Sequence, residues 1–406
     1  MMKPTCCCFA LALCTCCSVF GNRDRSGSGN ATQPVQHGSA SAVAVQTPVP
    51  SPDATLSGAI PSAEQALQKT LIMEGPGAGI DGVELGPGRN DGVIRMYGSA
   101  IFDGIGYEWS FQNGAWISNK TYSGLGVSST PRLGNLDGKG NALYTGIWNV
   151  GVATVGFHDG WGKPEMIPGT SGKKRVLAVK PGDGRGDGSQ RLYVGTDRGL
   201  FEYTRRGSNY ETLKLLDHAV GDFGLGDGRN DGVRRIYAGE RDGSQLHELS
   251  WDGQQFRDQV IYTCPETSEY SAHVGDGRSD GKNRVYAWCG KLIELTYANG
   301  HWTVLTVDEE RALRFYIRSG RVRSDQRSRL YVSQKPKGLK EYGWNLDQQR
   351  FEVDVVTGAT GGCAIGDGRG DHKNRLYVAR GSSAKFAEAA VVEFAASNPP
   401  PATAKP

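Results

Sequence analysis

GDGRNDGVRRIYAG, at residues 226–239, recurs along the chain and decides the fold. Three close copies lie at 182–195, 275–288 and 366–379, and a fifth, GPGRNDGVIRMYGS, lies at 86–99. Two degenerate copies occupy 134–146 and 320–333. The seven copies place one tyrosine each about 47 residues apart, at Tyr97, Tyr144, Tyr193, Tyr237, Tyr286, Tyr331 and Tyr377. A fixed period of this length indicates a repeat architecture.

Each copy carries the signals of four short β-strands. The glycine-rich loop precedes a β-type run such as 235–238, and a second alternating run such as 292–297 follows after a short turn. An Asn-Gly pair, as at 299–300, then predicts a hairpin leading into a third run. A fourth, less regular run leads into the next loop. Four strands per 47 residues is typical of a propeller blade, so we predict an all-β, seven-bladed β-propeller over 67–396.

The end of the repeat region predicts how the ring closes. The last copy stops near Phe394 without its third run, while 67–73 aligns with the third run at 210–216. We therefore expect 70–75 to form the outer strand of the last blade, beside 391–395. That pairing would cover an edge that an open ring would expose.

The composition excludes several classes of protein. The 406 residues include 58 glycines, but without the strict every-third-residue spacing of collagen. Lysine and arginine number 46 and aspartate and glutamate 43, so the net charge is +3. No clustered basic face stands out, and we expect no nucleic-acid partner.

The N-terminal residues predict export. Residues 1–20 have a lysine before a short apolar run, the layout of a signal peptide. Leu13-Cys14-Thr15-Cys16 resembles a lipobox, which predicts lipidation at Cys16; simple cleavage near Gly21 is the alternative. Residues 21–66 and 397–406 have the composition of a disordered linker and tail. We expect a monomer that is secreted or lipid-anchored to the cell envelope, with no other membrane contact.

Three cysteines remain in the repeat region, Cys264, Cys289 and Cys363. Cys264 and Cys289 could pair in an oxidising compartment, or all three could be buried thiols. The sequence leaves these two alternatives open.

The repeated loop resembles that of FG-GAP/VCBS repeats, which form integrin-like β-propellers, and the resemblance covers 70–396. In that family, oxygens at the first, third, fifth and ninth places of the loop hold calcium. This chain keeps aspartate at the first and fifth places of its four best copies, at Asp183, Asp187, Asp227, Asp231, Asp276, Asp280, Asp367 and Asp371. The third and ninth places hold arginine, at Arg185, Arg191, Arg229, Arg235, Arg278, Arg284, Arg369 and Arg375.

These arginines change the expected chemistry of the loop. Calcium takes six to eight oxygen ligands, and here two ligands are replaced by fixed cations. We expect structural ion pairs in which the arginines bridge the two aspartates, with no cofactor. The alternatives are calcium held by the aspartates, or arginines that bind an acidic sugar or a phosphate.

A second repeated residue is the glutamate of the second run in each blade. A paired-carboxylate enzyme uses two unlike environments, so we interpret these residues as structural partners of the loop arginines. They are Glu108, Glu202, Glu248, Glu294, Glu341 and Glu393. No catalytic residue is assigned.

Function is expected where the repeat is least regular. Candidate segments are 134–170, with Trp148, His158 and Trp161, and 308–329, with Arg311, Arg314, Arg318, Arg321 and Arg323. The leading hypothesis is a non-catalytic extracellular module that binds a glycan or a protein. The alternative is a secreted hydrolase or lyase acting on extracellular polysaccharide, for which ionisable groups should converge on the central channel.

A calcium titration tests the loop interpretation. Because arginine replaces two ligands, calcium should leave the melting temperature unchanged. A rise of many degrees on adding calcium, reversed by a chelator, would show that the aspartates hold the metal.

Overall fold

The computed structural model describes residues 67–75, 79–172, 175–265, 271–310, 313–335, 337–358, 361–380 and 389–396. These residues belong to one compact unit, Pro61–Pro406. Every element described in them is a β-strand. Within these ranges no helix is long and apolar enough to span a bilayer. The predicted signal peptide, Cys16, the linker and the tail lie outside the described residues.

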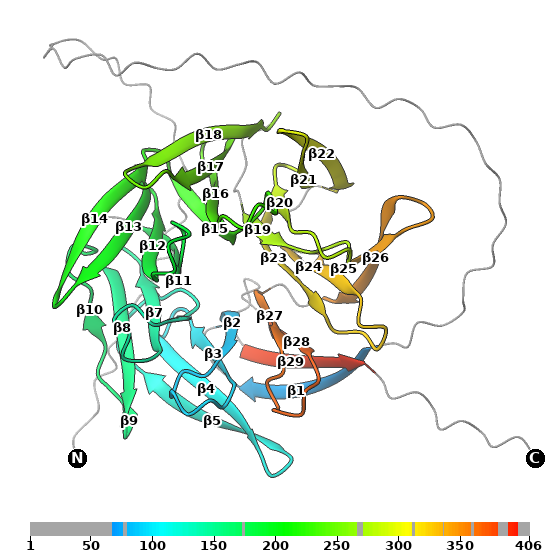
Figure 1. The fold of residues 1–406 in the computed structure, drawn as a ribbon. Helices are drawn as coiled ribbons and strands as arrows, with labels where there is room; N and C mark the ends of the chain where they lie inside the picture. Colours follow the sequence, from blue (N-terminus) through cyan, green and yellow to red (C-terminus); the bar gives the residue numbers. More distant parts are fainter. Residues whose placement is uncertain are drawn as a thin grey trace, which may run out of the picture. The chain divides into compact units, whose positions relative to one another are not determined.

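Six sheets are four-stranded blades (Figure 1). The first two along the chain are β2 (Ile80–Gly86), β3 (Arg95–Ala100), β4 (Ile105–Gln112), β5 (Ala115–Tyr122), and β11 (Val176–Gly182), β12 (Arg191–Thr196), β13 (Gly199–Arg206), β14 (Asn209–Leu216). The next two are β15 (Val220–Gly226), β16 (Arg235–Glu240), β17 (Gln245–Trp251), β18 (Phe256–Thr263), and β19 (Ala272–Gly275), β20 (Arg284–Trp288), β21 (Leu292–Ala298), β22 (His301–Asp308). The last two are β23 (Leu313–Arg321), β24 (Ser328–Lys335), β25 (Gly338–Asn345), β26 (Arg350–Thr357), and β27 (Cys363–Gly366), β28 (Arg375–Arg380), β29 (Ala389–Ala396), β1 (Leu67–Gly75).

The prediction of a seven-bladed propeller is wrong: six four-stranded blades are arranged in a ring, not seven. The sheet formed by the copy at 134–146 has five strands, β6 (Arg132–Gly134), β7 (Ala142–Ile147), β8 (Gly151–His158), β9 (Gly160–Trp161) and β10 (Glu165–Met166). Its β9 and β10 have two residues each and pair separately with β8. Gly162 and Pro164, which lie between β9 and β10, explain the difference, because proline cannot donate to a ladder and glycine weakens a strand.

The first strands of the sheets surround the centre of the ring (Figure 1). β2, β6, β11, β15, β19, β23 and β27 contact one another in that order, and β27 contacts β2. Closure occurs through β1, which pairs antiparallel with β29 from Leu67↔Ala396 to Gly75↔Ala389. The N-terminal strand is therefore the outer strand of the last blade, as its sequence predicts.

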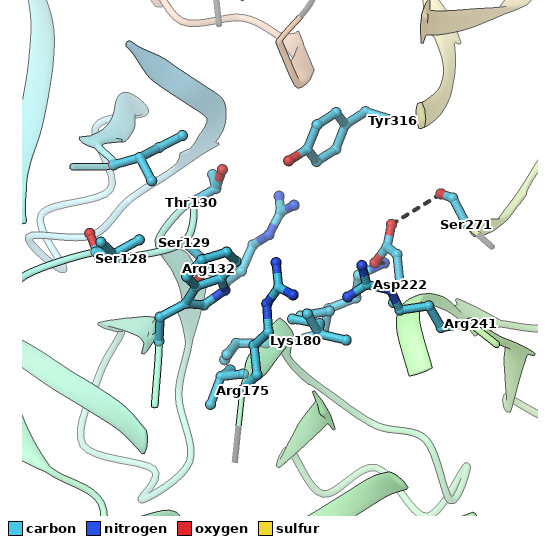
Figure 2. Close-up of a pocket in the computed structure, with 18 of the residues that line it drawn as sticks. Ser128, Ser129, Thr130, Arg132, Arg175, Lys180, Asp222, Arg241, Ser271 and Tyr316 are labelled. Atoms are coloured by element: carbon cyan, nitrogen blue, oxygen red, sulfur yellow. Dashed lines mark hydrogen bonds and ion pairs between the residues drawn. The ribbon is translucent and has the colours of Figure 1, made fainter. Parts of the chain in front are cut away.

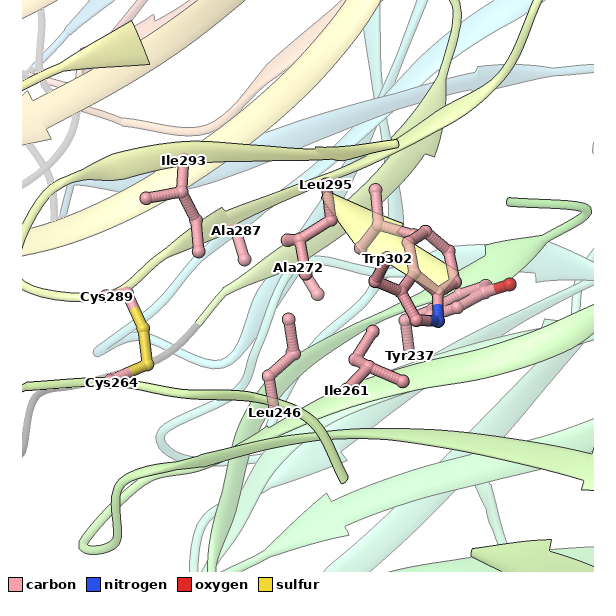
Figure 3. Close-up of a cluster of buried hydrophobic side chains, with 11 residues drawn as sticks. Tyr237, Leu246, Ile261, Cys264, Ala272, Ala287, Cys289, Ile293, Leu295 and Trp302 are labelled. Atoms are coloured by element: carbon pink, nitrogen blue, oxygen red, sulfur yellow. A yellow bond between two sulfur atoms is a disulfide. The ribbon is translucent and has the colours of Figure 1, made fainter. Parts of the chain in front are cut away.

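Apolar side chains fill the spaces between neighbouring sheets. Figure 3 shows one such cluster, between the β15–β18 and β19–β22 blades, with Leu246, Ala272, Leu295 and Trp302 among its members. A disulfide joins Cys264 to Cys289 at its side, with the Cα atoms 5.6 Å apart. The structure thus shows the paired alternative for these two cysteines, while Cys363 is a buried free thiol.

The repeat tyrosines explain a glycine of the loop. All seven tyrosines are at most 3% exposed. The Gly184 N–H donates to the Tyr193 hydroxyl over 3.1 Å, and a Cβ added at Gly184 would lie 2.7 Å from Tyr193 Cζ. A side chain at the second place of the loop would therefore displace the tyrosine that the loop covers.

A truncation tests the ring closure. A chain that begins at residue 77 lacks β1 and leaves β29 as an exposed edge, so it should lose the cooperative melting transition of the full-length protein. A chain that begins at Pro61 keeps β1 and serves as the control. Equal melting of both chains in a calorimeter would contradict the closure.

Candidate functional site

Two parts of the structure are candidate sites. One is the set of repeated loops, and the other is a pocket near the first strands, which surround the centre of the ring. The loops connect the first strand of each sheet to the second, so they lie at one end of the sheets. The pocket rim includes Phe102, Trp148 and Arg241, which follow second strands, and therefore lies at the other end.

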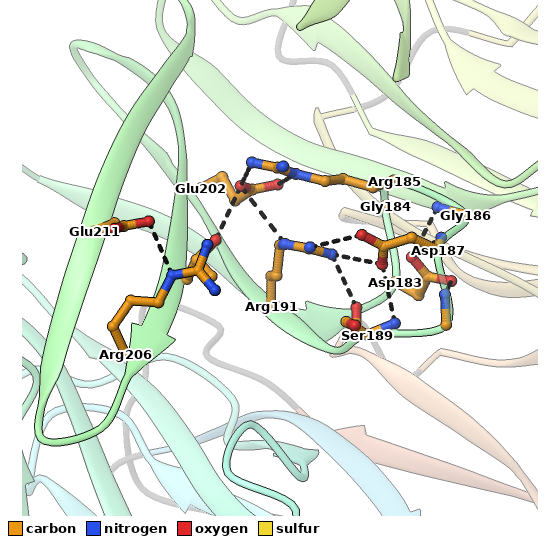
Figure 4. Close-up of polar contacts among 12 residues, drawn as sticks. Asp183, Gly184, Arg185, Gly186, Asp187, Ser189, Arg191, Glu202, Arg206 and Glu211 are labelled. Atoms are coloured by element: carbon orange, nitrogen blue, oxygen red, sulfur yellow. Dashed lines mark hydrogen bonds and ion pairs between the residues drawn. The ribbon is translucent and has the colours of Figure 1, made fainter. Parts of the chain in front are cut away.

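Figure 4 shows the loop network of the β11–β14 blade. Asp183, at the first place, accepts backbone N–H groups from Gly186 at 2.7 Å and Gly188 at 2.9 Å. Arg191, at the ninth place, donates two parallel bonds to Asp187, of 2.8 and 2.7 Å. Hydrogen bonding to Arg191 lowers the pKa of Asp187 to about 2. Asp183 thus defines the turn, and the predicted bridge between two aspartates is replaced by one arginine–aspartate pair.

The third-place arginine has a different partner. Arg185 Nε donates to Glu202 Oε2 over 3.0 Å, and Nη2 donates to Oε1 over 2.5 Å. The Tyr193 hydroxyl donates to the same carboxylate over 2.9 Å. The Arg185 guanidinium also stacks 3.7 Å from the ring centre of Trp251, which belongs to the next blade. One arginine therefore neutralises a buried carboxylate and contacts the neighbouring blade.

The arrangement recurs in all six regular blades. The arginine–glutamate pairs are Arg89–Glu108, Arg185–Glu202, Arg229–Glu248, Arg278–Glu294, Arg323–Glu341 and Arg369–Glu393. The arginine–aspartate pairs are Arg95–Asp91, Arg191–Asp187, Arg235–Asp231, Arg284–Asp280, Arg329–Asp325 and Arg375–Asp371. First-place aspartates cap the backbone of their loops at Asp183, Asp227, Asp276 and Asp367. The structural interpretation of the glutamates is confirmed. Calcium-free loops stay a prediction.

The five-stranded sheet departs from this arrangement. Its Asp137 accepts a 2.9 Å bond from Arg205 Nη1, which comes from β13 of the following blade. At this junction the loop therefore supplies a carboxylate and the next blade an arginine, whereas in the β11–β14 blade the loop supplies the arginine and the next blade an aromatic ring. This irregular sheet borders the pocket.

The pocket has a volume of about 210 Å³ (Figure 2). Its cations come from the five-stranded sheet and the next two blades: Arg132, Arg175, Lys180 and Arg241. Of the described residues that line it, only Asp222 is acidic. Hydroxyl groups come from Ser128, Ser129, Thr130, Ser271 and Tyr316, and apolar surface from Ile101, Phe102, Val127 and Trp148. Such a mixture of apolar wall and converging polar groups is typical of a small-ligand site.

The rim and the floor of the pocket differ in their contacts. At the rim, the Arg175 guanidinium lies 3.7 Å over the ring of Trp148, whose side chain is 39% exposed. At the floor, Lys180 Nζ lies 2.8 Å from Asp222 Oδ1, and Ser271 Oγ donates to Asp222 Oδ2 over 3.2 Å. Burial lowers the pKa of Lys180 to about 8 despite Asp222. Burial opposes the charge of Asp222, but Lys180 and Arg318 hold its pKa below the usual range.

The structure separates the residues of the two irregular segments. Trp148 lines the pocket, whereas Trp161 makes edge-to-face contacts with Phe157 and Tyr97 and His158 is exposed. Arg318 lies in β23, next to the channel groups whose pKa values it affects, and Arg323 is a loop arginine paired with Glu341. Arg321 is exposed, and Arg311 and the Arg314 side chain lie outside the described residues. The described arginines of this segment therefore lie in different surroundings and do not form one basic patch.

Sequence reasoning missed Lys180, Asp222 and Arg132, although a signal for two of them was available. Arg132 and Lys180 both stand two residues before the glycine that ends the first strand, at Gly134 and Gly182. Comparing that position between copies would have shown that it is often charged.

No protein-family model matches the sequence, and no curated protein matches it. Among solved structures, the fold is similar to that of BBS1N, crystallised in complex with ARL6DN. That match has 14% identity over 81% of this chain and 96% of the other, with a TM-score of 0.53. A lectin of Agrocybe aegerita, described as recognising non-reducing terminal N-acetylglucosamine, matches at 14% identity over 79% and 94% of the two chains, with a TM-score of 0.49. The BBS1N match shows the β-propeller fold alone, and no family-level match supports the FG-GAP/VCBS resemblance.

Substitution of the buried glutamate tests the loop network. In Glu294→Gln, Arg278 loses its counter-charge at a carboxylate that is 0% exposed. The free energy of unfolding should fall by about 3 kcal/mol. Glu211→Gln is the matched control, because the Arg206–Glu211 pair is 64% and 68% exposed and should change stability by less than about 0.5 kcal/mol. Equal denaturation midpoints for the two variants would refute the structural role of the network.

Proposed function

We propose that the protein is an extracellular, non-catalytic binding module whose ligand is an anionic glycan held in the pocket. The observation that supports this most directly is the excess of charge: four cations and one carboxylate line one small cavity. Each arginine can donate paired hydrogen bonds to a carboxylate or sulfate. The neighbouring hydroxyl groups suit the alcohols of a sugar.

The size and shape of the pocket favour a glycan over a protein. A stable protein interface buries roughly 1,200 Å² or more, whereas a cavity of about 210 Å³ accepts one small ring or charged group. Trp148 and Phe102 offer partly exposed aromatic surface at the rim, where a sugar ring could stack. The pocket also combines unlike residues from several sheets, so it differs from a set of equivalent sites between blades.

An extracellular location accords with the disulfide. Cys264 and Cys289 are joined, and such bonds persist mainly in oxidising compartments. We retain the proposal that the N-terminal segment directs export, either by cleavage or through a lipid on Cys16.

One observation favours the enzymatic alternative, a lyase that acts on an acidic polysaccharide. Elimination from a uronate needs cations to neutralise its carboxylate and a base to remove the adjacent proton. Lys180 has a pKa of about 8 and lies in a pocket that Arg132 and Tyr316 also line. Ionisable groups thus meet near the channel, as this alternative requires.

A glycan array with the chain from Pro61 onward tests the proposal, with paired neutral, uronate-containing and sulfated glycans. We expect acidic glycans to bind, and the bound glycan to quench the fluorescence of Trp148. Binding should become weaker as the salt concentration increases. Arg241→Gln should lower the affinity about tenfold, the value of one charge-assisted hydrogen bond.

The matched control is Arg257→Gln, which removes an arginine that is 65% exposed and paired with Asp252. Binding of neutral glycans alone, or an equal loss in both variants, would contradict the proposal. Incubation of the same protein with polyuronates distinguishes the lyase, since elimination creates an unsaturated product that absorbs ultraviolet light.

A further inference from the structure

Each first strand places one residue opposite a repeat tyrosine. The pairing register gives these residues as Glu84, Arg132, Lys180, Gly224, His273, Arg318 and Ala364. Five of the seven are ionisable, although the first strands surround the centre of the ring. Burying so many ionisable groups is costly unless they interact with one another or with a ligand.

The charges at the centre do not balance within the described residues. Arg132 forms an ion pair with Glu84, and Lys180 pairs with Asp222 at 2.8 Å. Arg318 Nη1 donates to the carbonyl of Ile317 over 2.8 Å, and no described carboxylate forms an ion pair with it. Three cations thus face two carboxylates.

The behaviour of His273 and Asp222 shows that these groups act on one another. Burial, together with Arg318 and Lys180, lowers the pKa of His273 to about 3, so the imidazole is neutral. Its Nε2 lies 2.9 Å from Ser319 Oγ. The charge of Asp222 is favoured by Lys180, Arg318 and Arg132 together. The three cations therefore share one region, in which an added proton is disfavoured and an added anion is favoured.

We propose that Lys180 and Arg132, which line the pocket, and Arg318 of the first strand β23 form an oxyanion site toward the centre of the ring, which accepts a sulfate, phosphate or carboxylate group. The bound group can be a free ion, or it can be a substituent of the glycan in the proposed function. Binding of the free ion does not depend on the proposed function. Gly224 and Ala364 leave two of the seven positions without a long side chain. Asp222 and Glu84 already pair with two of the cations, so they compete with an incoming anion.

The competition gives a gain-of-affinity test. In Asp222→Asn the carboxylate beside Lys180 is lost while its shape is kept, so sulfate should bind about tenfold more tightly. Lys180→Met and Arg318→Gln should each weaken sulfate binding about tenfold. Lys214→Gln is the matched control, because Lys214 is 44% exposed and pairs with Asp217, and its affinity for sulfate should equal that of the unchanged protein.

The measurement is titration calorimetry of the full-length chain with sodium sulfate, against sodium chloride at equal ionic strength. If Lys180→Met fails to fold, Asp222→Asn still decides the question. Sulfate binding that is absent, or that is the same in Asp222→Asn, Arg318→Gln and the control, would overturn the site.

The pH dependence gives a second readout. A bound anion stabilises charged Lys180 and raises its pKa above about 8, so affinity should be constant below pH 8 and fall above it. The charged groups that act on Lys180 are Asp222, Arg318 and Arg132. The lowered pKa of Asp222 and the raised pKa of Arg132 keep these two groups charged through this range, and His273 stays neutral. The fall should be absent in Lys180→Met; an unchanged pH profile in that variant would contradict the role of Lys180.

Competition separates the two sources of the anion and the two proposals. If sulfate displaces a bound acidic glycan, the acidic substituent of that glycan occupies the oxyanion site. Sulfate binding without glycan binding supports the oxyanion site and rejects the proposed function. Glycan binding that none of these three variants changes, together with an absence of sulfate binding, supports the function and rejects the site.

Discussion

A glutamate carboxylate withdrawn from water is the group around which each regular blade is arranged. Glu294 is 0% exposed, and such a charge is tolerable only with close counter-charges and hydrogen bonds. Arg278 supplies the counter-charge, and the Tyr286 hydroxyl donates to the same carboxylate over 3.0 Å. The loop must bring its arginine over the blade, which requires the tight turn capped by Asp276. Loop, tyrosine and strand spacing are therefore parts of one electrostatic unit.

The same unit joins neighbouring blades, because the outer face of the arginine is covered by an aromatic ring of the next blade. Arg278 lies 3.6 Å over Trp344, and Arg229 lies 4.3 Å over Tyr297. Repetition at one end of the sheets leaves the other end free to vary. The pocket occurs at that other end, beside the five-stranded sheet where the repeated unit is missing. The repeated loop network and the pocket thus lie at opposite ends of the sheets.

The repeated features could be predicted from the sequence, because features shared by the seven copies can be distinguished from substitutions in any one copy. The copies predicted the strands of the regular blades, the closing role of 70–75 and the partners of the glutamates. It failed at 159–166, where the tyrosine spacing of about 47 residues suggested another ordinary blade. A spacing does not report whether proline and glycine allow one continuous outer strand in place of two short ones.

The candidate site was harder to predict because its residues are not adjacent in any one copy. Lys180 and Asp222 come from different strands, and their contact depends on the ring geometry. Trp148 was singled out from the irregular segment, but its contact with Arg175 could not be. The partners of the two loop arginines were predicted wrongly for a related reason. Both arginines lie near both aspartates in the sequence, so only the hydrogen bonds in the structure show which arginine pairs with an aspartate and which with a glutamate.

The pairing of β1 with β29 also has a consequence for how the chain folds. Leu67 meets Ala396, so the last ladder joins residues that are separated by almost the whole repeat region. Contacts of such sequence separation form slowly, because a long loop must close before the pairing can stabilise it. Blades can form one by one as synthesis proceeds, but the ring stays open until the final strand has emerged. Closure of the ring therefore waits for the synthesis of β29.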